Sequence, residues 1–188
     1  MNDDPVHISE LDEAWALALA EAEQRARTAG RTDISTYLAL RSSNDLLRKT
    51  GRDWLRSVFT CVAGEANRAG AAIQITSEER HRFKVGNATM VGSRLSLANG
   101  VRILFVEAGW PRTPSDGFIR GGGLACANIK HLGLKSASEE LRLVVDPSGV
   151  PRWKVRSHSA GLHDLHETNV RDHIAILLND PPKPSKTP

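Results

Sequence analysis

Apolar residues in the first 70 positions recur every three or four residues, a spacing typical of amphipathic α-helices. Gly30, Gly51 and Gly70 interrupt this pattern, and each marks an expected helix end or break. Ser9 and Asp33 can cap helices, because their side chains accept hydrogen bonds from free backbone amides. The pattern therefore predicts three N-terminal helices, at about residues 9–30, 33–47 and 53–70.

From Ala71 onward the apolar period falls to two, which predicts a run of antiparallel strands. The clearest hairpin signal is Asn99-Gly100, because a tight two-residue turn needs positive φ at both residues. A turn there places Leu97 opposite Arg102. Both faces of this hairpin are apolar, so we expect it to be central in its sheet and covered on both sides. One face carries Leu95, Leu97, Leu104 and Val106, and the other carries Val101, Ile103 and Phe105.

A second hairpin is expected at residues 146–149, where Asp, Pro, Ser and Gly favour a turn. Pro151 cannot donate to a ladder of backbone hydrogen bonds, so the strand that contains it is predicted to be an edge strand. Helical spacing of apolar residues then predicts an amphipathic helix at about residues 164–179. Residues 181–188 are rich in proline and lack apolar anchors, so we expect a flexible tail there.

These elements predict the α+β class, with three N-terminal helices, an antiparallel sheet of about five to seven strands and one C-terminal helix. No internal linker divides the chain, so residues 1–180 are expected to form one domain. Its parts are a helical region (residues 1–70), the sheet (residues 71–157) and the C-terminal helix (residues 158–180). We expect the helices to cover one face of the sheet and to leave the other for solvent, a partner or a ligand.

The composition is that of an ordinary globular protein, with 188 residues, of which 40% are hydrophobic and 25% charged. No apolar run approaches the roughly 20 residues that span a bilayer, and the N-terminal segment is acidic. We therefore expect no membrane partner and a cytoplasmic location. Cys61 and Cys126 lack the spacing of a redox pair, and they are expected to be two buried thiols.

The net charge of +3 is unevenly distributed: residues 31–157 carry 20 basic and 11 acidic side chains, whereas residues 1–30 carry two and seven. Two segments of the predicted sheet alternate cations with apolar residues, which places the cations of each on a single face. On the same side of the sheet they would offer about six phosphate contacts. A solvated sheet face explains the pattern equally simply. The cations are Arg80, Arg82 and Lys84 in the first segment, and Arg152, Lys154 and Arg156 in the second.

The segment from Glu107 to Lys130 contains three successive glycines. Glycines permit close approach of the backbone to a ligand, and they leave backbone amides exposed to an anion. It also carries arginines and aromatic rings that could bind a phosphate and stack on a base. It matches neither the Walker pattern nor the dinucleotide fingerprint. An irregular hairpin loop is the alternative interpretation. The candidate residues are Arg112, Arg120, Trp110, Phe118, Gly121, Gly122 and Gly123.

Four histidines fall within sixteen residues, with carboxylates between them. This density of ligands could hold zinc or another divalent metal, and an open coordination position would then activate water. The spacing does not match the HExxH motif, and a solvated helix start is the simpler interpretation. The four are His158, His163, His166 and His173.

The leading hypothesis is a non-enzymatic module without a cofactor that binds a polyanion, foremost nucleic acid, as a possible subunit of a larger assembly. The basic middle of the chain and the alternating cations support it. The first alternative is a metal-dependent hydrolase that uses the four histidines. The second is a small-ligand or protein-interaction domain whose partner binds the apolar sheet face of Val101, Ile103 and Phe105.

Overall fold

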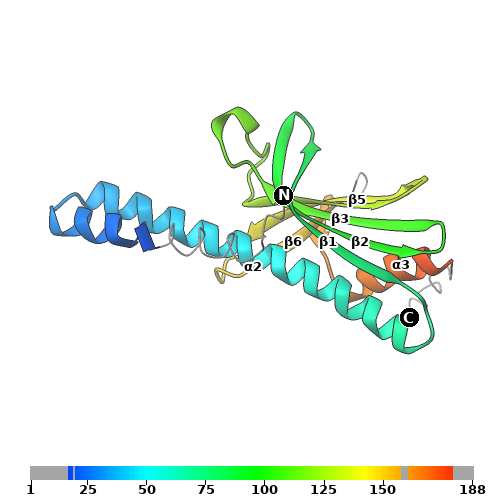
Figure 1. Cartoon of the computed structure of the whole chain (residues 1–188). Coiled ribbons are helices and arrows are strands. Elements are labelled where there is room, and N and C mark those ends of the chain that lie inside the picture. The colour runs from blue at the N-terminus through cyan, green and yellow to red at the C-terminus, as the bar shows by residue number, and fades with distance from the viewer. Residues whose placement is uncertain (1–16, 19, 158–160, 180–188) are drawn as a thin grey trace, which may run out of the picture. The chain divides into compact units, whose positions relative to one another are not determined.

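The structure is a computed structural model of the chain, and it describes residues 17–18, 20–157 and 161–179. These residues contain three α-helices and a seven-stranded antiparallel sheet, with helices at both ends, which confirms the predicted α+β class (Figure 1). The chain divides into two compact units, Met1–Leu47 and Arg48–Pro188. One domain over residues 1–180 stays a prediction, and the predicted tail, residues 181–188, lies outside the described residues.

The first unit is helical in its described part. Residues 20–28 form a helix, Gly30 turns the chain with a φ of 71°, and helix α2 (Thr32–Arg68) follows. Gly30 thus ends the first helix as predicted, because a left-handed residue suits glycine best. The predicted start of this helix at Ser9 lies outside the described residues.

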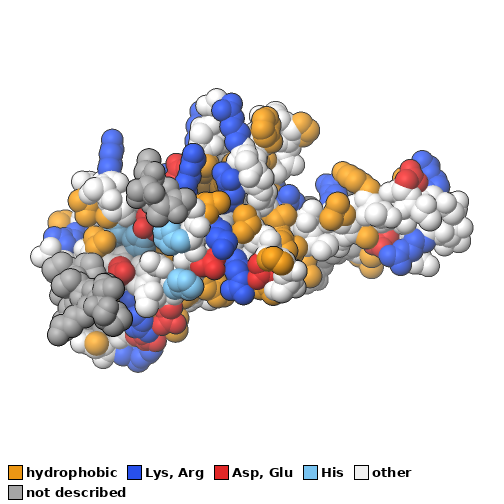
Figure 2. Space-filling view, turned by 180° about the vertical axis from the view of Figure 1, so that it is seen from behind, with side chains coloured by type: hydrophobic (Ala, Val, Ile, Leu, Met, Phe, Trp, Pro, Cys, Tyr) orange, Lys and Arg blue, Asp and Glu red, His pale blue; other side chains and the backbone are white. Residues whose placement is uncertain are grey.

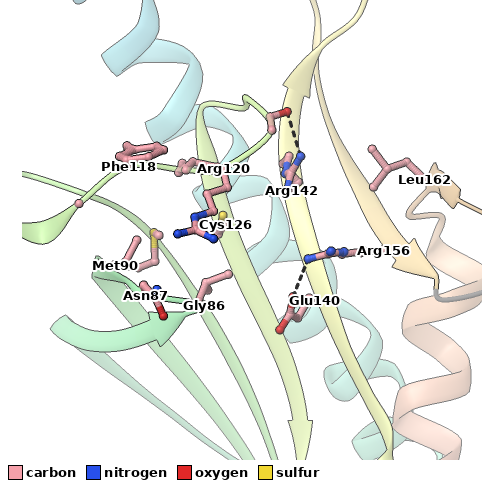
Figure 3. Close-up of a pocket in the computed structure, with 15 residues that line it drawn as sticks. Gly86, Asn87, Met90, Phe118, Arg120, Cys126, Glu140, Arg142, Arg156 and Leu162 are labelled. Carbon is pink, nitrogen blue, oxygen red and sulfur yellow. Dashed lines mark hydrogen bonds and ion pairs between the residues drawn. The ribbon is translucent and has the colours of Figure 1, made fainter.

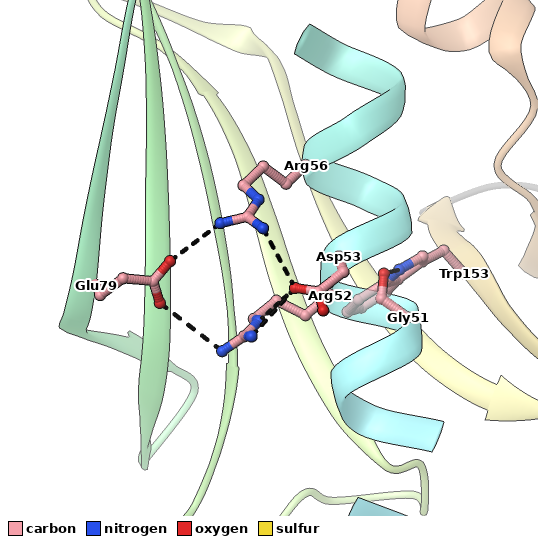
Figure 4. A network of polar contacts seen from close by, with 6 residues as sticks. All are labelled: Gly51, Arg52, Asp53, Arg56, Glu79 and Trp153. Atoms are coloured by element: carbon pink, nitrogen blue, oxygen red, sulfur yellow. Dashed lines mark hydrogen bonds and ion pairs between the residues drawn. The ribbon is translucent and has the colours of Figure 1, made fainter. Parts of the chain in front are cut away.

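The helix break predicted at Gly51 is wrong, because α2 continues through this residue to Arg68. A Cβ atom on Gly51 would lie 2.6 Å from Cδ2 of the buried Leu143. The backbone oxygen of Gly51 accepts a 2.8 Å hydrogen bond from the indole nitrogen of Trp153 (Figure 4). The glycine therefore serves the close packing of α2 on the sheet, a role that a helical pattern does not distinguish from a break.

The strands follow one another as neighbours in the order β1 to β7. In the hairpin of β2 and β3, Asn99 pairs with Arg102, so the turn is Gly100-Val101. Leu97 therefore pairs with Leu104 rather than with Arg102, a shift of two residues from the prediction, and a shift of two keeps every side chain on its predicted face. The strands are β1 (Gln74–Val85), β2 (Ala88–Asn99), β3 (Arg102–Trp110), β4 (Ala125–His131), β5 (Leu134–Val145), β6 (Pro151–Ser157) and β7 (Gly161–Asp164).

The second predicted hairpin is confirmed, since Val145 of β5 pairs with Pro151 of β6. The side chain of Asp146 orders its turn by accepting hydrogen bonds from the backbone of Ser148 and Val150. However, β6 is not the edge strand that Pro151 predicted, because β7 pairs with it beyond the proline, from Lys154 onward. Helix α3 (Glu167–Leu178) then forms within the predicted range.

One face of the sheet, here called the covered face, packs against the second unit's part of α2 and against α3. The main hydrophobic cluster joins Phe59 of α2, Leu97 of β2, Ile129 of β4 and Ile174 of α3, all of them buried. The prediction that helices cover one face is thus correct for these segments (Figure 1). Among the described residues, every helix is too short or too polar to span a bilayer.

The opposite face, here called the open face, carries a second and smaller hydrophobic cluster at one end of the sheet. A bulge at Arg80, where φ is 59°, lies beside Gly92 and Gly109 in the neighbouring strands. A Cβ atom on Gly92 would lie 1.9 Å from the backbone oxygen of Ala108, so only glycine permits this approach. Bulges and strand glycines bend a sheet. Beyond this bend, Phe83, Ala88, Met90 and Cys126 form the second cluster.

The two thiols are both free, as predicted, but only one of them is buried. Cys126 lies in the second cluster, whereas Cys61 is exposed on α2. Burial raises the pKa of the Cys126 thiol to about 11, so this thiol is protonated at neutral pH and a weak nucleophile.

Candidate anion-binding site

The open face holds a pocket of about 720 Å³ next to the second cluster (Figure 3). Its floor includes the buried side chains of Ala88, Met90 and Cys126. Three arginines and one glutamate reach its wall, and the volume lies in the range of small-ligand sites. The charged residues are Arg120, Arg142, Arg156 and Glu140.

Three parts of the chain that lie far apart in sequence build this pocket. The turn between β1 and β2 provides one wall, and the loop between β3 and β4 provides a second. The open faces of β4 to β7 complete it, through Cys126, Arg142, Arg156 and Leu162. The bend in β1 to β3 places the second cluster at its floor.

Asp116 organises the loop between β3 and β4, which contains the short 3-10 helix η1 (Pro114–Asp116). Its carboxylate accepts hydrogen bonds from the hydroxyl and backbone nitrogen of Thr113 and from the backbone nitrogen of Arg112. Arg82 of β1 adds a 2.7 Å ion pair. The hydroxyl of Thr113, foremost among these contacts, lowers the pKa of Asp116. These contacts fix the first part of the loop, residues 112–116, against β1.

The glycines of this loop pack closely on Arg142, a residue that the sequence analysis did not single out. Gly121, Gly122 and Gly123 all have positive φ. A Cβ atom on Gly121 would lie 2.7 Å from Nη1 of Arg142, and one on Gly123 would lie 2.7 Å from its Cγ. Nη1 of Arg142 donates a 3.0 Å hydrogen bond to the backbone oxygen of Gly121. The loop thus holds the Arg142 guanidinium at the pocket.

The other pocket arginines are less constrained. Arg156 lies 3.7 Å from the Glu140 carboxylate, a long ion pair between exposed side chains. Arg120 has no hydrogen bond or ion pair with any residue that the structure describes, and Figure 3 shows its side chain directed toward Cys126. The pocket therefore contains guanidinium groups with donors that remain available to a ligand.

The two cationic segments lie on opposite faces of the sheet, so the interface of about six phosphate contacts does not form. Arg82 pairs with Val91, which pairs with Trp110 of the main cluster, and this places Arg82 on the covered face. Lys154 pairs with Arg142 on the open face. Within each segment the cations do share a face, as predicted for Arg82 with Lys84 and for Arg152, Lys154 and Arg156.

Most of these cations also face an acidic side chain. Arg152 pairs with Asp146 at 2.6 Å, and Lys154 with Asp164 at 2.5 Å. The Lys154 ammonium is the main cause of the lowered pKa of Asp164. Arg80 lies in the bulge and also has interaction partners. Figure 2 shows basic and acidic side chains interspersed over one face of the molecule.

The two candidate aromatic residues differ in accessibility. Trp110 is 3% exposed and belongs to the main cluster, with the guanidinium groups of Arg48 and Arg112 over its ring at 6.0 and 4.0 Å from the centroid. It is therefore a core residue rather than a stacking platform. Phe118 is 72% exposed at the pocket wall, where its ring is available to a ligand.

The histidine candidates are dispersed. His158 lies outside the described residues. His163 is exposed on β7, His166 is exposed at the N-terminal end of α3, and His173 is buried. Within the described part of the chain, no group of three or more His, Cys, Asp or Glu side chains could hold a metal ion. The structure therefore gives the metal-dependent hydrolase no support in that part.

His173 instead joins α3 to the sheet through two residues that the sequence analysis did not consider. Its Nδ1 lies 3.0 Å from Nε2 of His131, and its Nε2 lies 3.3 Å from the Glu139 carboxylate. Burial, and then the neighbouring His173, lower the pKa of His131 to about 4. The bond from His173 lowers the pKa of Glu139, so Nε2 of His173 donates to an ionised carboxylate.

A buried carboxylate, Glu107, lies on the open face in the middle of β3. It accepts hydrogen bonds from Lys130 at 2.7 Å and Asn128 at 3.3 Å, and it bonds to His81 at 2.8 Å. Burial acts to raise the pKa of Glu107, but these bonds outweigh it and the net shift is downward. Both carboxylate oxygens of Glu107 thus form hydrogen bonds to other residues of the sheet, so we assign Glu107 a structural role.

The apolar face proposed for a partner is only partly apolar. Val101 is 94% exposed, but it lies in the turn between β2 and β3. Phe105 is half-buried beneath the Arg94 guanidinium, which lies 5.2 Å from the centroid of its ring. The pocket described above is lined by other residues.

No family model, no curated protein and no solved structure matches this chain. The geometry of the pocket is therefore the main indication of function. Of its charged residues, the sequence analysis found Arg120 and Arg156 but neither Arg142 nor Glu140. The alternation Leu141-Arg142-Leu143 is the signal that could have found Arg142, since it places one cation opposite two buried leucines.

Proposed function

We propose that this protein is a non-enzymatic module that binds a polyanion, with nucleic acid as the leading ligand class and the cytoplasm as its location. The observation that carries this proposal is the convergence of Arg120, Arg142 and Arg156 on one pocket. Guanidinium groups are planar and bind phosphate oxygens through bidentate hydrogen bonds. The exposed ring of Phe118 supplies a surface on which a base can stack.

This site involves fewer phosphates than the two cationic segments together would contact. Three pocket arginines can form about three ion pairs with phosphate oxygens, for which the logarithm of affinity for a single strand falls with the logarithm of salt at a slope of about −2. Six contacts would give about −4. The slope therefore distinguishes a pocket from a binding track along the whole sheet.

The chemistry of the pocket floor supports binding rather than catalysis. The Cys126 thiol in the pocket floor is protonated at neutral pH, because burial raises its pKa to about 11.

A role within a larger assembly is part of this proposal. In the first unit, Tyr37 and Leu40 are 61% and 60% exposed, and their i, i+3 spacing places them side by side on helix α2. Large apolar side chains on a helical surface are typical of protein-interaction sites. Loss of self-association or of partner binding when both residues are replaced would be the expected result.

The test is titration of labelled single- and double-stranded oligonucleotides with the full chain across a salt series from about 50 to 300 mM. We expect binding with a salt slope near −2, and a loss of roughly tenfold in affinity for Arg120→Ala, because a hydrogen bond to a charged group contributes about 1.5–3 kcal/mol. Lys135→Ala is the matched control, since Lys135 is exposed and lies outside the pocket. Absence of binding at 50 mM salt, or equal losses in both variants, overturns the proposal.

A further inference from the structure

We propose that the pocket recognises a phosphate monoester attached to a planar ring, such as a nucleotide with a terminal phosphate, and not the internal phosphodiesters of a strand. This inference rests on the proposed function and specifies which part of the polyanion the pocket receives. Four features of the pocket carry it: its net charge, the fixed position of Arg142, the lack of a partner for Arg120 among the described residues, and the apolar floor beside an exposed ring.

The charge of the pocket fits a dianion. Its three arginines and one glutamate leave two positive charges in excess. A phosphate monoester carries about −1.5 to −2 at pH 7, whereas each internal diester carries −1. A terminal phosphate therefore neutralises the pocket with one group, while a diester leaves about one positive charge buried against the ligand.

Arg142 is held in place before any ligand arrives. The loop glycines allow its side chain to lie against the backbone, and Nη1 donates to the oxygen of Gly121. A guanidinium has five N–H donors, so this single bond leaves others for a phosphate. Because the side chain is already ordered, little conformational entropy is lost when an anion binds.

Arg120 and Arg156 supply the second and third charges from different sides. Arg120 comes from the loop and has no partner among the described residues, while Arg156 comes from β6 and shares only a 3.7 Å pair with Glu140. Figure 3 shows Arg142 and Arg156 on adjacent strands and Arg120 on the loop side. Cations on several sides suit the three equivalent terminal oxygens of a monoester better than the two free oxygens of a diester.

The remaining surface suits a flat and weakly polar group. Ala88, Met90 and Cys126 form an apolar floor, and methionine adapts to the shape of a bound ring. Phe118 is 72% exposed and Leu162 is 49% exposed at the wall. Exposed apolar side chains beside a cationic pocket gain burial when a ring covers them. Phosphate alone would leave this surface uncovered.

The test is calorimetric titration of the full chain with four small probes: adenosine 5′-monophosphate, adenosine, phenyl phosphate and inorganic phosphate. We expect the monophosphate to bind at least tenfold more tightly than adenosine and than inorganic phosphate, with phenyl phosphate between. Its affinity should fall several-fold between pH 7.5 and pH 5, because the second ionisation of a phosphate monoester lies near pH 6. Equal binding of adenosine and its monophosphate overturns the inference.

Variants separate the roles of the pocket residues. Arg120→Ala and Arg142→Lys should each weaken binding of the monophosphate about tenfold or more, whereas Glu140→Gln should strengthen it a few-fold by removing a negative charge from the wall. Lys135→Ala, outside the pocket, should leave it unchanged. Circular dichroism of each variant verifies folding. Failure of Glu140→Gln to strengthen binding, together with unchanged binding in Arg120→Ala, contradicts the inference even if Arg142→Lys fails to fold.

A pair of oligonucleotides of one sequence, with and without a 5′-phosphate, separates this inference from the proposed function. Tighter binding of the phosphorylated strand supports both. Equal, salt-dependent binding of the two strands overturns the terminal-phosphate inference and leaves the nucleic-acid proposal standing. Binding of the monophosphate without binding of either strand overturns the nucleic-acid proposal and leaves the terminal-phosphate inference standing. It would identify free nucleotides as the source of the phosphate. Absence of binding to every probe overturns both.

Discussion

The two cationic strand segments have the same sequence pattern but different surroundings. In β6, the residues that alternate with the cations, Trp153 and Val155, pack into the main cluster on the covered face, so the cations lie on the open face. In β1, Phe83 packs into the second cluster on the open face, so Arg82 and Lys84 lie on the covered face. Alternation thus establishes which side chains share a face, but the cluster that takes the apolar side chains decides which face that is.

The two clusters also differ in the helices and strands that form them. The main cluster joins helices α2 and α3 to most of the sheet, whereas the second is built from the bent end of β1 and β2, from Cys126 of β4 and, at its margin, from Ile119 of the loop. The candidate site lies on the second cluster. We therefore expect the covered face to govern global stability and the second cluster to govern ligand binding.

The largest expected effect is the contrast between Phe59→Ala and Phe83→Ala. Phe59 is fully buried in the main cluster, so its removal should lower the free energy of unfolding by about 3–5 kcal/mol. Phe83→Ala should cost less, about 1–2 kcal/mol, because the end of a hairpin collapses more readily around the lost volume. Urea denaturation measures both. Equal losses would show that the second cluster is as much a part of the global core as the first.

The pair of His131 and His173 makes the covered face sensitive to acid. His131 has a pKa of about 4 in the folded protein, below its ordinary value of 6.5, so the unfolded chain binds the proton more tightly. Its contribution to stability is complete above about pH 6.5 and is lost as the pH falls toward 4, by up to about 3 kcal/mol. The lowered pKa of Glu139 acts in the same direction at lower pH.

Denaturation at pH 7 and pH 5 tests this dependence. We expect the free energy of unfolding to fall between these values in the unchanged protein and to fall less in His131→Gln. A fall of equal size in both proteins would assign the acid sensitivity to other groups.

Two glycines of α2 provide the next contrast. Gly51→Ala places a Cβ atom 2.6 Å from Leu143, so it should destabilise the protein by about 1–3 kcal/mol. At Gly64 the nearest atom, Nη1 of Arg68, lies 3.7 Å away, so Gly64→Ala should stabilise by about 0.5–1 kcal/mol through helix propensity. Thermal denaturation compares the two. Stabilisation by both substitutions would mean that α2 does not pack tightly on β5.

The smallest effect directly compares the two cationic segments. Arg156→Ala should weaken oligonucleotide binding by about tenfold, or 1.4 kcal/mol, because Arg156 lines the pocket. Lys84→Ala should change it less than about twofold, since Lys84 lies on the other face and outside the pocket. Anisotropy titrations at one salt concentration are sufficient. A larger loss of affinity in Lys84→Ala than in Arg156→Ala would show that the ligand binds at β1 instead.

Local chemistry explains which parts of the fold were predictable. Glycine at a helix end, alternation in the strands and an Asp-Pro-Ser-Gly turn each act within a few residues, and Gly30, the hairpin faces and the turn after Val145 were predicted correctly. The break at Gly51 and the edge position of Pro151 were predicted wrongly. Each depends on a distant partner, Leu143 for the glycine and β7 for the strand.

The candidate site was predictable only in part, for the same reason. Arg120, Phe118 and Gly121 were found because the loop combines cations, a ring and glycines within a short segment. Arg142 and Glu140 belong to β5, where the alternation with buried leucines indicates a cation on one face of the strand, but no cation, ring or glycine beside it in the sequence indicates a ligand. Trp110 looked accessible beside the loop, yet it is buried, because its position on β3 faces the main cluster.

The sequence by itself determined the α+β class, the order of helices and strands, and the set of side chains that share each face of a strand. These follow from periodicity, turn chemistry and helix capping, which are properties of neighbouring residues. Only the tertiary structure decided that the two cationic segments face apart and that three arginines meet beside the second cluster. The physical reason is that the bend in β1 to β3 creates a second place to bury apolar side chains, and each strand turns its apolar side to the nearest one.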